Sequence, residues 1–347
     1  MNKRTETTFR ARAPLRLGLA GGGTDVSPYL DDFGGLVLNV TINKYAYATL
    51  EPRTDGKVEL RNADSRDGWV GEATTSLPVT KGVELHAGVY NRIVKDFCGG
   101  RPCPITITTH SEAPPGSGLG SSSTMVVALV KAFAEMLSLP LGDYEVARLA
   151  YSIERADLGM AGGKQDQYAA AFGGLNFIEF YANDRVIVNP LRLKPHYRAE
   201  LEASLVLYFT GVSRKSEEIV KQQVSNMKAK SVESMEALHA LKRDAVQMKE
   251  AVLLGDLENI AASMRHSWEA KKATASSVSN AMIDQIFDSA LASGAMAGKV
   301  SGAGGGGFMM FIVEPTKRAN VIAKLSEFQG QVMLGGFVEY GAHAWRA

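Results

Sequence analysis

The chain has 347 residues, of which 45% are hydrophobic and 22% charged, as is typical of a soluble globular protein of about two domains. Its 38 basic and 37 acidic residues leave a net charge of +1, which disfavours nucleic acid or an anionic membrane as a partner. Glycine stands out, because about a third of its 35 residues gather in three clusters that lie between apolar segments.

The chain carries no sign of export or membrane insertion. Its first ten residues, MNKRTETTFR, are polar and lack the apolar core of a secretory signal. Apolar runs such as 308–313 are far shorter than the ~18 residues that a membrane span needs. Cys98 and Cys103 are too few for a disulfide framework and are expected to be reduced thiols. We therefore expect a cytoplasmic protein.

The first half of the chain mixes strands with helices. Runs rich in β-branched and aromatic residues predict strands, and apolar residues three or four apart predict helices. On these patterns the strands are expected at 36–50, 104–109, 175–181 and 185–191, and the helices at 121–138 and 143–158. Asp143 is the expected N-cap of the second helix, and an Asn183-Asp184 turn should join the last two strands into a hairpin.

The second half has a mainly helical pattern. In chain order we expect a strand at 204–209, helices over 213–293 with breaks near Gly255 and at 273–279, and strands at 308–313 and near 336–340. Strands and helices thus occur in both halves without regular alternation. This predicts an α+β fold rather than a doubly wound parallel sheet, with a domain boundary near 195–203.

The most informative glycine cluster is PPGSGLGSSST at 114–124, between a predicted strand and a predicted helix. Glycine lets a backbone approach a ligand, and the free N–H groups of a helix start form an anion site. One serine would be enough to cap the helix, so three serines after three alternating glycines favour phosphate binding. The loop is not a Walker A motif, because GxxxxGK[ST] is absent from the chain.

The other two glycine clusters lie near the ends of the chain. The first, RAPLRLGLAGGGTD at 12–25, holds Arg16 in an apolar segment, where a buried arginine needs an anionic partner; an arginine that faces solvent is the alternative. The third, KVSGAGGGG at 299–307, contains GxGxxG. A strand-like segment follows it rather than a helix, which argues against a dinucleotide fold. It is expected to close over a ligand or to form a tight turn.

In this order and spacing the three clusters resemble the motifs of the galactokinase–homoserine kinase–mevalonate kinase–phosphomevalonate kinase (GHMP) superfamily. PPGSGLGSSS at 114–123 is similar to the family's phosphate loop. The resemblance implies an α+β kinase fold with a ribosomal-protein-S5-like domain over 1–198 and a ferredoxin-like α/β-plait domain over 199–347. It also implies ATP and Mg²⁺ as cofactors and a small-molecule acceptor, and it leaves a homodimer open.

The resemblance also implies roles for individual residues. An aspartate in the segment 153–174 is the family's catalytic base, and a glutamate about a dozen residues upstream binds Mg²⁺. Asp166 and Glu154 fit, with Ser122 as a second metal ligand and Arg16 holding Asp166 ionised. A turn residue and a solvent-facing helix residue are the alternatives for Asp166 and Glu154. The ATP phosphates are assigned to Pro115, Gly116, Ser117, Gly118, Leu119, Gly120, Ser121, Ser122 and Ser123.

Two signatures bear on the acceptor. GGGTD at 21–25 and GGKQDQYAAAFGG at 162–174 depart from the galactokinase pattern. They are similar to those of the family's bacterial heptose 7-phosphate kinases, which phosphorylate the anomeric hydroxyl on the way to GDP-heptose for surface polysaccharide. L-fucokinase-type domains share them, so a kinase for an unphosphorylated sugar stays open. The substrate candidates are Gly22, Gly23, Thr24, Asp25, Gly163, Lys164, Gln165, Gln167, Gly304, Gly305, Lys44 and Arg214.

Among these candidates, Lys44, Lys164 and Arg214 would meet the sugar's own phosphate, or else remain solvated surface charges. A relative that keeps the fold without catalysis is the other class of protein considered. It is disfavoured because Asp166, Glu154 and the serine-rich loop are all present.

Overall fold

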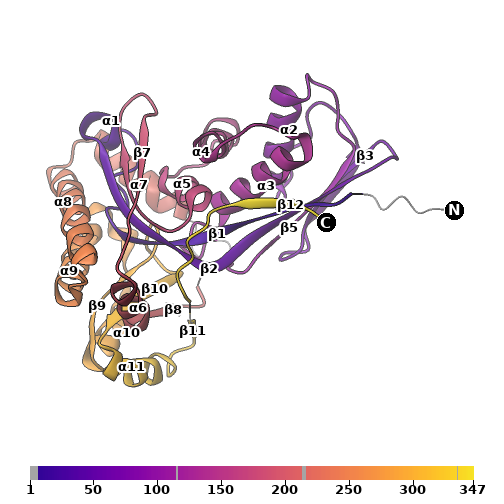
Figure 1. The fold of residues 1–347 in the computed structure, drawn as a ribbon. Coiled ribbons are helices and arrows are strands. Elements are labelled where there is room, and N and C mark those ends of the chain that lie inside the picture. The colour runs from indigo at the N-terminus through magenta and orange to yellow at the C-terminus, as the bar shows by residue number, and fades with distance from the viewer. Residues whose placement is uncertain (1–6, 115, 213–215, 334) are drawn as a thin grey trace.

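The computed structural model describes residues 7–114, 116–212, 216–333 and 335–347. Within them lie two β-sheets and the helices that cover them, so the expected α+β class is confirmed (Figure 1). Two residues assigned from the sequence, Pro115 and Arg214, lie outside the described residues.

The larger sheet has eight strands among the described residues. Their order is β12 (His343–Arg346), β1 (Phe9–Ala20), β2 (Gly35–Pro52), β5 (Ile105–Ser111), β3 (Lys57–Asn62) and β4 (Gly68–Glu72). In addition, β6 (Leu175–Phe180) pairs with the first part of β2, and β7 (Val186–Pro190) pairs with β6. The long β2 serves two neighbours on one edge, β6 over 35–40 and β5 over 46–52. β1 follows its other edge, so the first glycine cluster emerges from the end of an inner strand.

The smaller sheet comes from the second half of the chain. Its antiparallel strands, in sheet order, are β11 (Gln331–Met333), β8 (Leu205–Phe209), β10 (Phe308–Val313) and β9 (Ala295–Val300). Every residue of β10 is buried, because Met310 and Ile312 enter one apolar cluster and Met309 and Phe311 enter another. A strand covered on both faces has a continuous apolar sequence, which explains FMMFIV.

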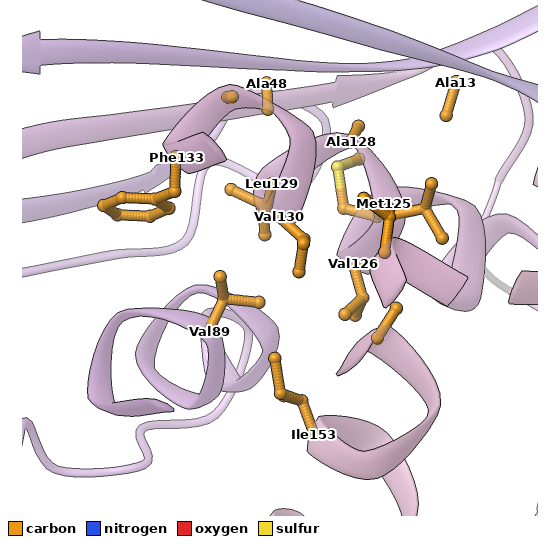
Figure 2. Close-up of a cluster of buried hydrophobic side chains, with 14 of the residues drawn as sticks. Ala13, Ala48, Val89, Met125, Val126, Ala128, Leu129, Val130, Phe133 and Ile153 are labelled. Atoms are coloured by element: carbon orange, nitrogen blue, oxygen red, sulfur yellow. The ribbon is translucent and has the colours of Figure 1, made fainter. Parts of the chain in front are cut away.

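Helix α3 (Ser121–Leu137), which begins at the second glycine cluster, is the centre of the apolar core that packs against the larger sheet. Figure 2 shows its side chains between Ala13 and Ala48 of the sheet on one side and Val89 and Ile153 on the other. It is therefore apolar on more than one face, and this packing fixes where its first turn points. The helices of this layer are α2 (Glu84–Phe97), α3 (Ser121–Leu137), α4 (Asp143–Ser152) with a π-helical turn at Ile153–Asp157, and α5 (Gln165–Phe172).

A helix pair from the second half packs against β1. α8 (Val232–Leu254) and α9 (Leu257–Thr274) are joined at Gly255, whose φ of 68° ends α8. Met248 and Met264 of this pair share a buried cluster with Leu17 of β1. The remaining helices are α1 (Tyr29–Phe33), α6 (Pro195–Ser204), α7 (Ser216–Lys228), α10 (Ala281–Ala292) and α11 (Arg318–Leu325), with 3-10 turns at Ser276–Val278 and Pro315–Lys317.

Two local predictions are wrong. Asp143 is the first residue of α4 rather than its cap, because Gly142 occupies the cap position and no side chain caps the helix. The strand expected near 336–340 is a single bridge between Phe337 and Ile42, and the neighbouring strands are β11 and β12. The other predicted strands and helices are confirmed, while the domain limits 1–198 and 199–347 stay a prediction.

Two findings concern the whole described chain. Cys98 and Cys103 are free thiols, as expected. No helix in the described ranges combines the length and the hydropathy that a membrane crossing requires.

Candidate active site

The three glycine clusters meet around one cavity of about 800 Å³. Gly23 and Asp25 reach it from the loop after β1, and Gly302 and Ala303 from the loop after β9. The second cluster supplies the longest stretch of lining, namely Gly116, Gly118, Gly120, Ser121, Ser122 and Ser123. Segments almost 300 residues apart in the sequence therefore surround the same space.

The second cluster turns sharply into α3. Gly116, Gly118 and Gly120 have φ values of 72°, 81° and 77°, which favour glycine. Gly120 occupies the cap position and no side chain caps α3. The first N–H groups of the helix therefore keep their capacity to bind an anion.

The third cluster packs directly on this loop. A Cβ at Gly118 would lie 2.5 Å from the Ser301 carbonyl oxygen, and one at Gly302 would lie 2.9 Å from Gly118 Cα. The Ser301 hydroxyl donates to the Gly118 carbonyl at 2.9 Å, and the Phe308 N–H donates to Ser117 at 2.8 Å. Close backbone approach thus accounts for the glycines on both sides.

The serines of the second cluster divide into two groups. Ser117 and Ser121 bond each other at 2.9 Å, and Ser117 is fully buried away from the cavity. Ser122 lines the cavity and donates to Glu154 Oε1 at 3.1 Å. Leu119 belongs to the apolar core, and its carbonyl accepts from the Arg16 N–H at 3.1 Å.

Glu154 is buried in the π-helical turn, with 1% of its surface exposed, so the solvent-facing alternative is wrong. Its Oε2 accepts from Gln167 Nε2 at 2.5 Å, and Gln167 also donates to Ser123 at 3.0 Å. The described residues hold no cluster of three His, Cys, Asp or Glu side chains that could bind a metal ion. A divalent cation beside Glu154 and Ser122 would therefore need further oxygen ligands from bound phosphates.

Asp166 and Arg16 meet as the sequence predicted. Asp166 lies in the first turn of α5, and its Oδ1 accepts from Arg16 Nε at 2.7 Å and lies 2.6 Å from Nη2. Arg16 Nη1 donates to the Gly118 carbonyl at 2.6 Å. Arg16 is 3% exposed, whereas the Asp166 side chain is 22% exposed and lines the cavity. The guanidinium thus links the Asp166 carboxylate to the loop of the second glycine cluster, and the carboxylate stays accessible from the cavity.

Asp25 joins the first cluster to the start of α5. Its Oδ1 accepts from the Gly23 N–H at 3.0 Å and its Oδ2 from the Gln165 N–H at 3.0 Å. A Cβ at Gly163 would lie 2.0 Å from Oδ2, so only glycine allows this contact. The Thr24 hydroxyl does not line the cavity and instead bonds the backbone of Gly21 and Leu36, which stabilises the loop after β1.

The structure separates the substrate candidates. Gly23, Asp25, Gly163 and Gln165 line the cavity. Seven others do not line it, namely Gly22, Thr24, Lys44, Lys164, Gln167, Gly304 and Gly305. Lys164 instead binds Asp184 Oδ1 at 2.5 Å, and the Gly305 N–H donates to the Val278 carbonyl at 2.8 Å.

Sequence reasoning missed two buried lysines. Lys271 of α9 lines the cavity and donates to the Gly22 carbonyl at 3.2 Å, and burial lowers its pKa to about 8 although nearby Asp25 opposes the shift. Lys299 of β9 donates to the Leu19 carbonyl at 3.2 Å, and burial together with the nearby charge of Lys271 lowers its pKa to about 7.

Comparison with known proteins defines the class. The family profiles described as GHMP kinases N terminal domain and GHMP kinases C terminal match residues 84–174 and 248–330. The chain belongs to the GHMP kinase family, whose members transfer phosphate from ATP. The family, the kinase activity and the fold that the motifs predicted are thereby confirmed.

Individual relatives narrow the comparison. The chain is 48% identical to the D-glycero-alpha-D-manno-heptose 7-phosphate kinase of Campylobacter jejuni, over 98% of this chain and 99% of that protein. It is also 48% identical to a solved D-glycero-D-manno-heptose 1-phosphate kinase from Bacteroides thetaiotaomicron, with a TM-score of 0.83 over 98% and 99% of the chains. A Lactococcus lactis galactokinase complexed with galactose, at 16% identity and a TM-score of 0.75 over 96% and 94%, shares the fold.

Proposed function

We propose that this protein transfers a phosphoryl group from ATP to the anomeric hydroxyl of D-glycero-D-manno-heptose 7-phosphate, giving the 1,7-bisphosphate and ADP for GDP-heptose synthesis. The observation that carries the proposal is the 48% identity, over nearly the whole of both chains, to the Campylobacter jejuni kinase of that name. The Bacteroides relative is also named for a heptose phosphate, so the two names agree on the sugar.

At the donor end, the chain's task is to bind and orient the ATP phosphates. The uncapped start of α3 and the loop 116–120 offer backbone N–H groups to them. Ser122 and Glu154 would hold Mg²⁺, because a hydroxyl and a carboxylate 3.1 Å apart are hard oxygen ligands of the kind it prefers. When bound, the metal neutralises negative charge on the phosphates.

At the acceptor end, Asp166 would take the proton of the anomeric hydroxyl. Phosphoryl transfer depends mainly on position and charge, and the contacts of Arg16 with Asp166 and Gly118 would keep the base at a fixed distance from the donor loop. Asp25 and Gln165 line the same part of the cavity and would bind sugar hydroxyls. An acceptor that lacks those hydroxyls would leave buried polar groups unpaired, which gives specificity.

One observation favours the alternative, a kinase for an unphosphorylated sugar of the fucokinase type. Lys44 and Lys164, two of the three cations predicted to meet the sugar's phosphate, do not line the cavity. The third, Arg214, lies outside the described residues.

A substrate panel tests both functions. ADP release would be measured with heptose 7-phosphate, unphosphorylated heptose, mannose, fucose and galactose as acceptors. We expect kcat/KM to be highest for heptose 7-phosphate by at least ~10-fold over unphosphorylated heptose, since a charged group adds that much through its hydrogen bonds. A higher kcat/KM for fucose or another free sugar would refute the proposal and support the alternative.

A further inference from the structure

Lys271 is a buried cation that lines the cavity. Its side chain comes from α9, and the residue is 3% exposed. Among the described residues no carboxylate oxygen lies within the 4.0 Å of an ion pair with its ammonium group, and the one hydrogen bond of that group goes to the Gly22 carbonyl. Arg16, which also lines the cavity, already binds Asp166.

An unpaired charge in such a place needs an explanation. Removing an ammonium group from water is costly unless an anion or several hydrogen bonds compensate. The ammonium has three N–H donors, and one of them serves Gly22. The other two remain for a ligand in the cavity that Lys271 lines.

The surroundings define what that ligand is. Asp25, Arg16 and Asp166 all lie close enough to affect the charge of Lys271. Of these, Asp25 is proposed to bind the sugar, Asp166 to accept its proton and Arg16 to position Asp166. The bond to Gly22 holds the ammonium beside the loop that leads to Gly23 and Asp25. A cation in this position is suited to a phosphoryl oxygen at the acceptor end.

We propose that Lys271 binds a phosphoryl group of the reactants at the acceptor end of the cavity. The proposal rests on the proposed function, since it takes this end of the cavity as the place of the sugar. The phosphoryl group has two sources with the same chemistry, namely the phosphate that the sugar already carries and the group that ATP transfers. The two sources predict different kinetics. The sugar's own phosphate is present only in a phosphorylated acceptor, whereas ATP supplies the transferred group with every acceptor.

Lys299 provides a matched control. It is also a buried lysine from the second half of the chain, and it also donates to a carbonyl of the first glycine cluster, that of Leu19. Unlike Lys271, it does not line the cavity. Replacing Lys299 therefore disturbs the first glycine cluster without removing a charge from the lining of the cavity.

The experiment compares the Lys271→Met, Lys271→Gln and Lys299→Met variants of the full chain. Gln keeps a donor for the Gly22 carbonyl but has no charge, so it separates a structural hydrogen bond from phosphoryl binding. We expect both Lys271 variants to lose at least ~10-fold in kcat/KM for heptose 7-phosphate, the scale of a charged hydrogen bond. We expect Lys299→Met to stay within ~3-fold of wild type. Thermal unfolding and binding of a non-hydrolysable ATP analogue verify that each variant is folded.

The acceptors distinguish the two sources. If Lys271 binds the sugar's phosphate, KM for heptose 7-phosphate rises and the kinetics with unphosphorylated heptose stay unchanged. If it binds the transferred group, kcat falls with both acceptors. Wild-type kinetics in Lys271→Gln would overturn the proposal, and so would an equal loss in Lys299→Met. Should wild type not use heptose 7-phosphate, the proposed function fails, and the same variants are compared with its preferred sugar and that sugar's phosphate.

Discussion

Two cations from different halves of the chain lie near Asp166, and they differ in how their charge is compensated. Arg16, from β1, binds the carboxylate at 2.6–2.7 Å and the Gly118 carbonyl at 2.6 Å. Lys271, from α9, has one bond to a backbone carbonyl. The Arg16 charge positions the Asp166 carboxylate of the protein itself, whereas the Lys271 charge is available to a ligand that enters the cavity. Proximity to Asp166 therefore does not assign one role to both cations.

The most severe test of this comparison is Asp166→Asn. It keeps the size of the side chain and removes the charge that Arg16 binds. We expect kcat to fall by at least ~100-fold, because general-base catalysis contributes ~10²–10⁴, while the dissociation constant of ATP stays near that of wild type. Steady-state kinetics and nucleotide titration measure the two. A kcat within a few-fold of wild type would mean that Asp166 is not the base and that its contact with Arg16 is a structural ion pair.

Arg16→Lys asks whether the geometry of the first cation matters or only its charge. Lysine cannot reproduce the planar fork that contacts Asp166 and Gly118 together. We expect kcat to fall by ~10–100-fold through the loss of charged hydrogen bonds, with little change in KM for the sugar. If the variant retained full activity, a point charge would suffice here as it does at Lys271, and the contrast between the two cations would disappear.

Glu154→Gln tests whether the donor end acts independently of both cations. The substitution removes the carboxylate charge next to Ser122, so we expect the Mg²⁺ concentration for half-maximal activity to rise at least ~10-fold, as changes at metal sites commonly do. Glu145→Gln, at an exposed position on α4, serves as the control. A Mg²⁺ titration that does not move in Glu154→Gln would argue against metal binding at this residue.

The smallest expected effect concerns stability. Burial lowers the pKa of Lys271 from 10.5 to about 8, so its charge opposes folding below pH 8, and this cost disappears as the pH rises from 8 toward 10.5. Asp25, Asp166, Arg16 and Lys299 are the charged groups around it. At pH 7 and without ligand, Lys271→Met should be more stable than wild type by ~1–3 kcal/mol.

Denaturant unfolding of wild type and Lys271→Met between pH 7 and pH 10 measures this difference in stability. The gap between the two proteins should narrow as the pH rises. A variant that is less stable than wild type at pH 7 would mean that the Lys271–Gly22 hydrogen bond stabilises the fold. That result would contradict the view that the Lys271 charge costs stability until a ligand binds it.

The sequence predicted the donor end better than the acceptor end. The motif 114–124 carries its own signal, since glycines and serines before a helix have a local purpose, and Ser122 faces the cavity as expected. At the start of α5 successive side chains point in different directions. Asp166 reaches the cavity, whereas Gln167 turns to Glu154 and Lys164 turns to Asp184. Adjacency in sequence to a functional residue therefore does not establish a shared role.

Lys271 carried a weaker signal, which helical spacing could have revealed. Met264, Trp268 and Ala275 are buried, and Lys271 lies between them at the same spacing of three or four residues. Its neighbour Lys272 follows the exposed side of α9 and binds Glu269. A lysine on the apolar face of a helix is thus distinguishable from sequence, but which cavity it reaches depends on how α9 packs against β1.

The pairing of the short strand β12 has a consequence for synthesis of the chain on the ribosome. It pairs with Phe9–Arg12 of β1 (Figure 1), although more than 300 residues separate the two segments. During synthesis, the edge of β1 over Phe9–Arg12 stays unpaired until residues 343–346 have left the ribosome. An open strand edge invites association with other chains, so this part of β1 stays exposed to such association even after all three glycine clusters have been synthesised.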